Sequence, residues 1–293
     1  MDWISPEQWT AFGAEDTDAH RLANGRGGWL DRYGDWILWS GAGPPQVEGL
    51  REEVMGRYGF SPRGWLGRVL VKRAIDQKPA MLLAGENPGE IMVRENGIAY
   101  LVEPAAGYSS GLFLDQRANR QWVAAFGAKR MLNLFAYTCS FTVCAAAAGA
   151  ETCSVDSARS VLGRGRANLE TNGIDPAGGH RFLVDDATKV VLRLVKRGEK
   201  FDLIVLDPPT FGRAAGNVFR IEKNLPDLVS QCFGLLEPGG CLLASCNYSE
   251  WGKKDLQNLC REAVAGAPYS IEYGERPPEI PHGAVSCRIR KER

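Results

Sequence analysis

Several features of membrane, secreted and metal-binding proteins are missing from this sequence. No apolar run reaches the roughly 20 residues that a membrane-spanning helix needs. The first twenty residues have neither a basic leader nor an apolar core, so no secretory signal peptide is expected. The eight cysteines form no Cys-x-x-Cys pair, which argues against a zinc site and against a disulfide framework. These absences predict a protein of the reducing cytoplasm that binds no metal.

Net charge is also missing, because Lys+Arg and Asp+Glu each number 35. A strongly basic chain would have indicated a nucleic-acid partner, whereas a balanced one neither indicates nor excludes it. The 293 residues are 44% hydrophobic and 24% charged, which is ordinary for a globular protein of one large or two modest domains.

Two regions of the chain differ in their pattern. Residues 1–105 are rich in Trp, Gly and Arg and show little helical periodicity. Within them, residues 90–104 predict a β-hairpin, because β-forming residues flank Asn96-Gly97, a dipeptide suited to two positive φ angles. We expect a small β-rich accessory domain over residues 1–105, a candidate for RNA binding.

Residues 106–293 alternate between buried strands and helices of roughly 10–15 residues. Strands are predicted over 131–135, 152–156, 181–185, 201–206, 241–246, 268–273 and 284–289. This alternation predicts an α/β domain whose mostly parallel sheet is covered on both faces. The helix before the fifth strand is expected to carry Pro226 in its first turn. Ligands of such sheets bind beyond the carboxyl ends of the strands, so the residues there are the candidates for function.

Acidic residues follow the second and third predicted strands. Asp156 lies about 20 residues after the first turn, a position suited to accepting hydrogen bonds from both ribose hydroxyls. The alternative for Asp156 is a helix cap or a contact with a helix dipole. Asp185 and Asp186 follow the third strand and suit an exocyclic amine such as that of adenine. Both positions favour a cofactor with an adenosine end.

The turn after the first strand distinguishes between adenosine cofactors. It lacks the Gly-x-Gly-x-x-Gly pattern that lets a backbone approach a pyrophosphate. Phe135, Tyr137 and Thr138 occupy this turn instead. The sequence therefore disfavours NAD and FAD and favours S-adenosylmethionine, which has adenosine and no phosphates.

A family resemblance extends over roughly residues 65–290. It is carried by the motifs 107-GYSSGLFLDQRANR-120, 133-NLFAYTCSFT-142, 152-TCSVDSA-158, 183-LVDDATK-189, 201-FDLIVLDPPTF-211 and 243-LASCN-247. Their order resembles the class I S-adenosylmethionine-dependent methyltransferases of large-subunit ribosomal RNA. That group includes cytosine-5 enzymes with an N-terminal RNA-binding domain and the guanine-N7 half of a bifunctional enzyme. The resemblance implies a Rossmann-like domain with a seven-stranded sheet, S-adenosylmethionine as the cofactor and ribosomal RNA as the substrate.

One position departs from the family pattern, since relatives often have glycine where this chain has Cys139. A non-glycine residue there requires either a negative φ or local strain.

The resemblance also implies which residues contact the cofactor. They are Gln116, Arg117, Asn133, Phe135, Tyr137, Thr138, Asp156, Asp185, Asp186 and Asp207. The group from Asn133 to Thr138 would line the methionine side, Asp156 would bind the ribose, and Asp186 or Asp185 would face the adenine amine. Arg117 would pair with the methionine carboxylate, and its alternative is a structural or RNA-phosphate contact.

Two chemistries remain open for the substrate base. In the first, Asp207 and Pro208 hold a base nitrogen, with Phe211 stacked on the base. In the second, which the sequence slightly favours, Cys246 attacks the 6-position of a cytosine so that carbon 5 becomes nucleophilic. The alternative for Cys246 is a small buried side chain, as for most free cysteines.

Two other functions stay possible from the sequence alone. One is the methylation of a small planar molecule, and the other is a non-catalytic nucleotide-binding α/β module. The sequence does not give the oligomeric state, and a homodimer is one option.

Overall fold

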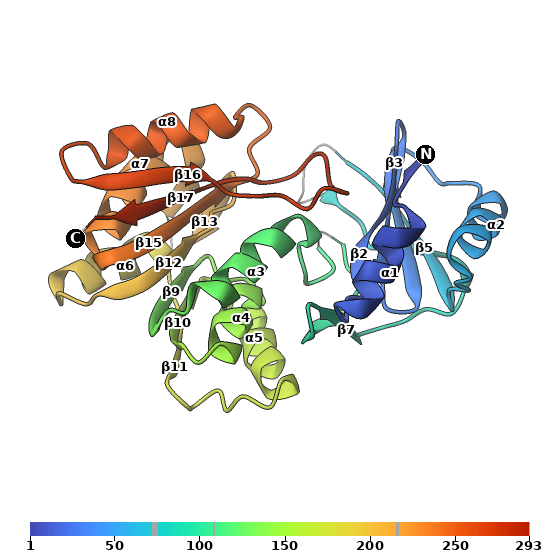
Figure 1. The fold of residues 1–293 in the computed structure, drawn as a ribbon, viewed down its shortest axis with the longest axis horizontal. Helices are drawn as coiled ribbons and strands as arrows, with labels where there is room; N and C mark the ends of the chain where they lie inside the picture. Colours follow the sequence, from blue (N-terminus) through green and yellow to red (C-terminus); the bar gives the residue numbers. More distant parts are fainter. Residues whose placement is uncertain (72–75, 108, 215–216, 293) are drawn as a thin grey trace. The chain divides into compact units, whose positions relative to one another are not determined.

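The computed structural model describes residues 1–71, 76–107, 109–214 and 217–292 (Figure 1). The chain divides into two compact units. The first comprises Met1–Arg117 together with Pro277–Pro281, and the second comprises Ala118–Arg276 together with His282–Arg293. The sequence placed the division near residue 105 and did not reveal that the short segment 277–281 joins the first unit.

The first unit is built on a six-stranded sheet in the order β1-β2-β3-β4-β5-β6. Its strands are β1 (Asp2–Trp3), β2 (Ala19–Gly25), β3 (Gly28–Tyr33), β4 (Trp36–Gly41), β5 (Gly64–Val69) and β6 (Met81–Gly85). A separate hairpin of β7 (Ile91–Glu95) and β8 (Ile98–Val102) turns at Asn96 and Gly97, whose φ angles are +51° and +75°. The predicted β-rich region and its Asn-Gly hairpin are therefore confirmed.

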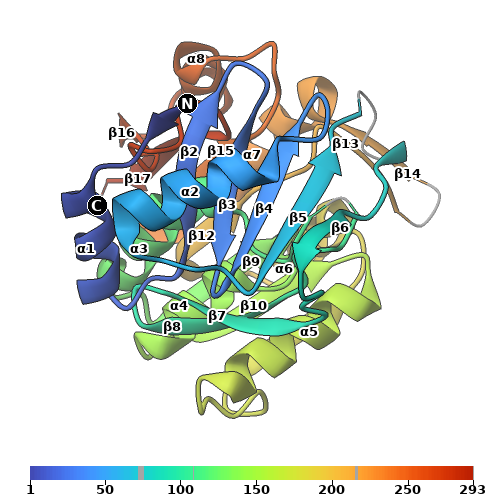
Figure 2. The same ribbon diagram turned by 90° about the vertical axis from the view of Figure 1, so that its right-hand side faces the viewer.

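This unit also contains two helices that the sequence pattern did not reveal. Helix α1 (Pro6–Ala14) is capped by the Ser5 side chain, and α2 (Val47–Tyr58) lies across the sheet in Figure 2. The apolar face of α2 is narrow, because only Val47 and Val54 are buried. A face of two residues gives too weak a periodicity to be recognised in a sequence.

A buried histidine lies in the core region of the first unit. His20 is fully buried, its ring is stacked 4.1 Å from that of Phe12, and Trp9 meets it edge-on at 5.7 Å. Its Nδ1 lies 3.1 Å from the Arg21 carbonyl oxygen, while its Nε2 has no hydrogen-bond partner among the described residues. Burial lowers the pKa of His20 to about 3, so the ring is neutral at pH 7.

This histidine predicts an acid sensitivity of the first unit. Between pH 6 and pH 4 the unfolded chain protonates His20 and the folded chain does not. His20 should therefore lower the free energy of unfolding by about 1.4 kcal/mol for each pH unit of acidification in this range. Urea unfolding of the wild type and of His20→Phe at several pH values measures this slope. Equal slopes for the two proteins would contradict the prediction.

The second unit is built on a seven-stranded sheet in the order β11-β10-β9-β12-β15-β17-β16. The strands are β9 (Arg130–Leu134), β10 (Glu151–Asp156), β11 (His180–Val184), β12 (Phe201–Leu206), β15 (Leu236–Cys246), β16 (Tyr269–Tyr273) and β17 (Val285–Lys291). Strands β11, β10, β9, β12 and β15 are parallel to one another, and β17 is antiparallel to its two neighbours. All seven strands match the segments predicted from the sequence, and the fold class is confirmed.

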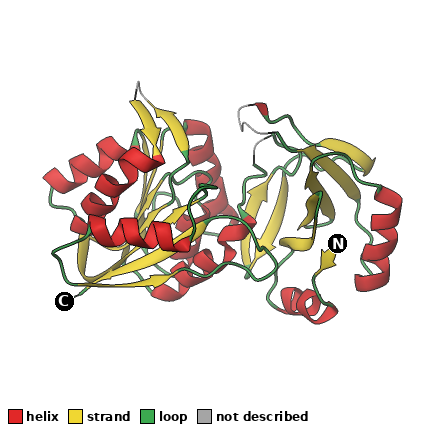
Figure 3. Cartoon of the chain, turned by 90° about the horizontal axis from the view of Figure 1, so that it is seen from above, coloured by secondary structure: helices red, strands yellow, loops and turns green. Residues whose placement is uncertain are grey.

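Helices cover both faces of this sheet (Figure 3). They are α3 (Arg117–Phe126), α4 (Ser140–Ala147), α5 (Arg159–Thr171), α6 (Ala187–Lys196), α7 (Ile221–Gly234) and α8 (Lys253–Ala263). The largest apolar core packs side chains of α6, α7 and α8 against one face of the central strands. The chain runs outward from β9 through β10 to β11 and then returns to β12 on the other side of β9. The loops after β9 and β12 therefore leave the sheet at its topological switch point, where ligands of open α/β sheets bind.

The segment between β12 and α7 differs from the sequence prediction. A short antiparallel hairpin of β13 (Phe211–Ala214) and β14 (Asn217–Arg220) lies there, and α7 begins at Ile221. The sequence had suggested that Pro226 lies in the first turn of the helix, but it lies further inside. Because proline has no N–H, α7 forgoes one backbone bond at this point and is still held by its buried apolar face.

Candidate cofactor and substrate site

The loop after β9 has an unusual backbone. Phe135, Tyr137 and Cys139 have φ angles of +57°, +48° and +62°. Left-handed backbone is unfavourable for any residue with a Cβ, so three such residues in alternation need support from their surroundings. Of the two options that the sequence left for Cys139, the structure shows the strained one.

Asp156, at the end of β10, supplies part of that support. Its Oδ2 accepts a hydrogen bond from the Tyr137 N–H at 2.9 Å, and its Oδ1 accepts one from the Ala158 N–H at 3.0 Å. Helix α5 contributes a second tie, because the Asn168 side chain donates to the Thr138 carbonyl at 2.9 Å. One carboxylate thus joins the loops that follow β9 and β10.

Asn133 lies beneath this loop and is 1% exposed. Its amide donates to the Thr142 hydroxyl at 2.9 Å, and that hydroxyl lies 2.7 Å from the hydroxyl of Ser154. The chain of buried hydrogen bonds links β9, α4 and β10. Asn133 therefore has a supporting role inside the protein, and its contact with a cofactor remains a prediction.

Cys139 is accommodated by a glycine on the neighbouring helix. The Cys139 side chain is fully buried and packs with Ala136 and Leu162. A Cβ placed on Gly165 of α5 would lie 2.4 Å from the Cys139 sulfur, which is not a possible contact. Burial also raises the pKa of Cys139 to about 12, so this thiol is unreactive at neutral pH.

The two acids after β11 both have partners within the protein. Asp186 is buried and caps α6, accepting from the Thr188 N–H at 2.8 Å and from the Thr188 hydroxyl at 2.6 Å. Asp185 accepts from Arg193 at 2.7 Å, and this hydrogen bond lowers the pKa of Asp185. The structure gives both residues a local structural role, and the adenine contact remains a prediction.

Gln116 and Arg117 lie at the end of the first unit. Gln116 is buried. The Arg117 guanidinium donates to both carboxylate oxygens of Glu279, at 2.5 and 3.1 Å, and lies over the ring of Phe12. Glu279 therefore gives Arg117 the structural contact that was the alternative to cofactor binding. The pairing of Arg117 with a methionine carboxylate remains a prediction.

The loop after β12 is tied to the end of β15. Asp207 accepts a hydrogen bond from the Ser245 hydroxyl at 2.7 Å, and the Thr210 hydroxyl donates to the Asn247 carbonyl at 3.1 Å. Pro208 is buried, and Phe211 is 50% exposed. The segment thus combines a rigid backbone with an accessible aromatic ring.

Phe219, which the sequence did not suggest, contacts a residue of the candidate site. It lies on β14, and its ring centroid is 5.3 Å from that of Phe135. The contact connects the loops that follow β9 and β12, on the two sides of the switch point. No strand or helix was predicted over residues 212–220, so the sequence gave no reason to expect this aromatic ring beside Phe135.

Cys246 lies at the end of β15, as predicted, but its side chain belongs to the apolar core. It is fully buried and packs in the cluster that contains Leu206 and Ala244. Burial raises the pKa of Cys246 to about 11. A nucleophilic cysteine needs the opposite shift, because the thiolate is the reactive form.

Within the described part of the chain, no helix has both the length and the apolar character needed to cross a bilayer. The same residues contain no group of three or more His, Cys, Asp or Glu side chains arranged to hold a metal ion.

The chain is similar to known methyltransferases. The model of the S-adenosylmethionine-dependent methyltransferase family matches residues 62–290. Ribosomal RNA large subunit methyltransferase I of Aeromonas salmonicida is 39% identical over 189 residues, which are 64% of this chain and 46% of that protein. Ribosomal RNA large subunit methyltransferase K/L of Hahella chejuensis is 32% identical over 260 residues, which are 84% of this chain and 35% of that protein. The chain thus spans about half the length, or less, of these curated relatives.

A solved structure extends the similarity to nearly the whole chain. The crystal structure of SMU.776 complexed with SAH superposes with a TM-score of 0.82 at 27% identity. The match covers 97% of this chain and 78% of that one.

The contact between Cys139 and Gly165 predicts that the effect of Gly165→Ala on stability has opposite signs in the wild type and in Cys139→Gly. In the wild type, Gly165→Ala should destabilise the second unit by about 1–3 kcal/mol, because the new methyl group meets the Cys139 sulfur. In Cys139→Gly the same change should stabilise the unit by up to about 1 kcal/mol, because alanine favours a helix over glycine. Chemical denaturation of the four proteins measures this coupling, and additive effects would contradict it.

Proposed function

We propose that this chain, which belongs to the S-adenosylmethionine-dependent methyltransferase family, methylates a base of large-subunit ribosomal RNA. One observation carries the proposal. On one side of the switch point, Asp156 follows β10 and anchors the left-handed loop after β9. On the other side, the rigid Asp207-Pro-Pro segment follows β12. The two relatives described above, which are named for ribosomal RNA, support RNA as the substrate class.

The residues around the first loop suit S-adenosylmethionine, which supplies a methyl group on a positively charged sulfur when bound. Each oxygen of Asp156 accepts one backbone N–H and retains a lone pair for a ribose hydroxyl. The loop holds Phe135 and Tyr137 where glycines would approach a pyrophosphate, which fits a cofactor without phosphates. We assign the ribose to Asp156, the adenine amine to Asp185 or Asp186, and the methionine side to the loop.

The segment after β12 suits a planar base. Pro208 and Pro209 restrict the backbone, so the carbonyl groups beside them are fixed in direction. Ser245 holds the Asp207 carboxylate at 2.7 Å, and the half-exposed ring of Phe211 offers a surface on which a base can stack. Transfer requires these residues to align the acceptor atom in line with the methyl group.

The acceptor atom separates the two chemistries. The sequence slightly favours carbon 5 of cytosine, which needs the Cys246 thiolate. The burial of Cys246 and its raised pKa of about 11 favour a base nitrogen instead, since a nitrogen lone pair is nucleophilic without a covalent intermediate. We therefore assign the acceptor to a nitrogen held by the Asp207-Pro208 segment.

Replacement of Cys246 tests this assignment. Cys246→Ala should retain methyl transfer to ribosomal RNA fragments within about threefold, and the matched control Cys232→Ala, also fully buried, should do the same. Labelled methyl groups from S-adenosylmethionine report the rate. A loss of about 1,000-fold or more in Cys246→Ala alone would establish the covalent route to carbon 5.

The substrate itself is tested in cells. Mass-spectrometric mapping of modified nucleosides should show that one methylated base of large-subunit ribosomal RNA disappears when the gene is deleted and returns with the wild-type chain. An unchanged ribosomal RNA would favour the alternative substrate, a small planar molecule.

A further inference from the structure

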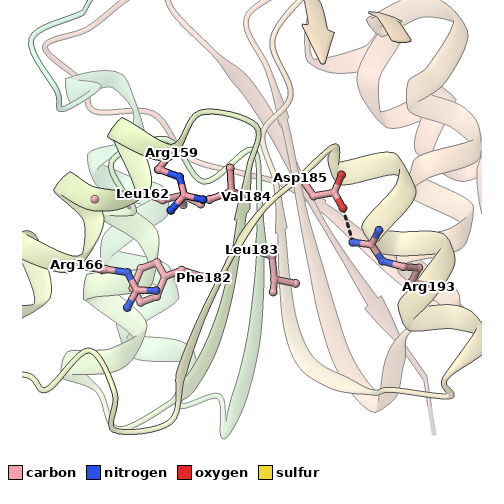
Figure 4. A pocket seen from close by; sticks show the side chains of 9 residues that line it. Arg159, Leu162, Arg166, Phe182, Leu183, Val184, Asp185 and Arg193 are labelled. Carbon is pink, nitrogen blue, oxygen red and sulfur yellow. Dashed lines mark hydrogen bonds and ion pairs between the residues drawn. The ribbon is translucent and has the colours of Figure 1, made fainter. Parts of the chain in front are cut away.

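A pocket of about 560 Å³ lies against the edge strand of the second unit (Figure 4). Strand β11 is the edge strand, with β10 as its neighbour in the sheet. The lining residues come from α5, from β11 and the loop after it, and from α6; they are Arg159, Leu162, Gly163, Arg166, Phe182, Leu183, Val184, Asp185 and Arg193. Neither Asp156 nor Tyr137 lines it, but Asp185 does, so the pocket borders the residues proposed for the adenine amine and does not include those assigned to the ribose and methionine.

The charges in the pocket are unequal. The lining contains three arginines and one carboxylate, that of Asp185, which pairs with Arg193 at 2.7 Å. Arg159 and Arg166 remain, and the structure shows no ion pair for either of them among the residues it describes. The pocket therefore presents two positive charges that nothing in its own walls balances.

The two arginines are placed to donate hydrogen bonds. The guanidinium of Arg166 lies 4.2 Å from the centre of the Phe182 ring, and Figure 4 shows the two side chains together. Stacking on a ring uses the face of a guanidinium and leaves the N–H groups in its plane to bind an anion. Arg159 is exposed at the first residue of α5.

The position of Arg159 does not help the helix. The first turn of α5 carries no acidic residue, and a cation at a helix N-terminus opposes the helix dipole. Helix stability therefore does not account for this arginine.

We propose that this pocket binds backbone phosphates of the RNA substrate through Arg159 and Arg166, away from the target base. The inference rests on the proposed function. A chain with zero net charge must draw its attraction for a polyanion from local clusters, and two unbalanced guanidinium groups in one concave site form such a cluster. RNA is favoured over an acidic peptide because RNA is the proposed substrate and carries a phosphate at every nucleotide.

The test compares Arg159→Gln/Arg166→Gln with Lys254→Gln/Arg261→Gln. Lys254 and Arg261 are exposed on α8, a helix that packs on β16 and β17, so the control pair removes the same number of positive charges outside the pocket. The pocket variant should bind a large-subunit ribosomal RNA fragment at least about tenfold more weakly in about 0.1 M salt. The slope of log affinity against log salt should become shallower by about 0.7–0.9 for each lost phosphate contact. Calorimetric affinity for S-adenosylmethionine should stay within about twofold of the wild type.

Each other outcome overturns the inference in a distinct way. RNA affinity and salt slope equal to those of the control would mean that no phosphate binds here, while base methylation by the wild type would leave the proposed function intact. A parallel loss of S-adenosylmethionine affinity would assign the pocket to the cofactor. Loss of inorganic phosphate binding with unchanged RNA binding would make it a free-anion site. Absence of both RNA binding and methylation in the wild-type chain would overturn the proposed function together with the inference.

Discussion

The rest of the candidate site depends on the hydrogen bonds that the Asp156 carboxylate accepts. It accepts one backbone N–H from the loop after β9 and one from the loop after β10, and so fixes two strand ends relative to each other. The first of these loops contains three non-glycine residues with positive φ. Such backbone costs on the order of 1–3 kcal/mol per residue and persists only where neighbouring groups hold it.

Helix α5 completes this arrangement by approaching the strained loop closely. Gly165 leaves room for the Cys139 sulfur, and Asn168 binds the carbonyl of Thr138. The same helix carries Arg159 and Arg166 toward the edge strand. One helix therefore supports the proposed cofactor loop on one side and the proposed phosphate pocket on another. On the other side of the switch point, the contact between Phe135 and Phe219 joins the cofactor loop to the hairpin that follows Asp207.

Much of this architecture was predictable because it follows from local pattern. Five strands of the second unit (β9, β10, β11, β12 and β15) alternate along the chain with helices, and the acids at their ends follow from that assignment. The hairpin at Asn96-Gly97 was predictable from turn chemistry. The support of Cys139 by Gly165 was not, since the two residues lie on different elements and a helical glycine has no distinctive spacing. The β13–β14 hairpin was not predicted, and the helix after it begins at Ile221, so Pro226 lies beyond the first turn in which it was expected. For Arg117, Asp185 and Asp186 the sequence identified polar positions but not their partners within the protein.

A crystal structure of the chain with S-adenosylhomocysteine tests the role of Asp156 most directly. Both ribose hydroxyls should lie within about 3.2 Å of the Asp156 oxygens, while the N–H groups of Tyr137 and Ala158 keep their bonds to the same carboxylate. A ribose bound elsewhere, with Asp156 still contacting only the two backbone N–H groups, would reduce this acid to a structural cap and contradict the proposed cofactor site.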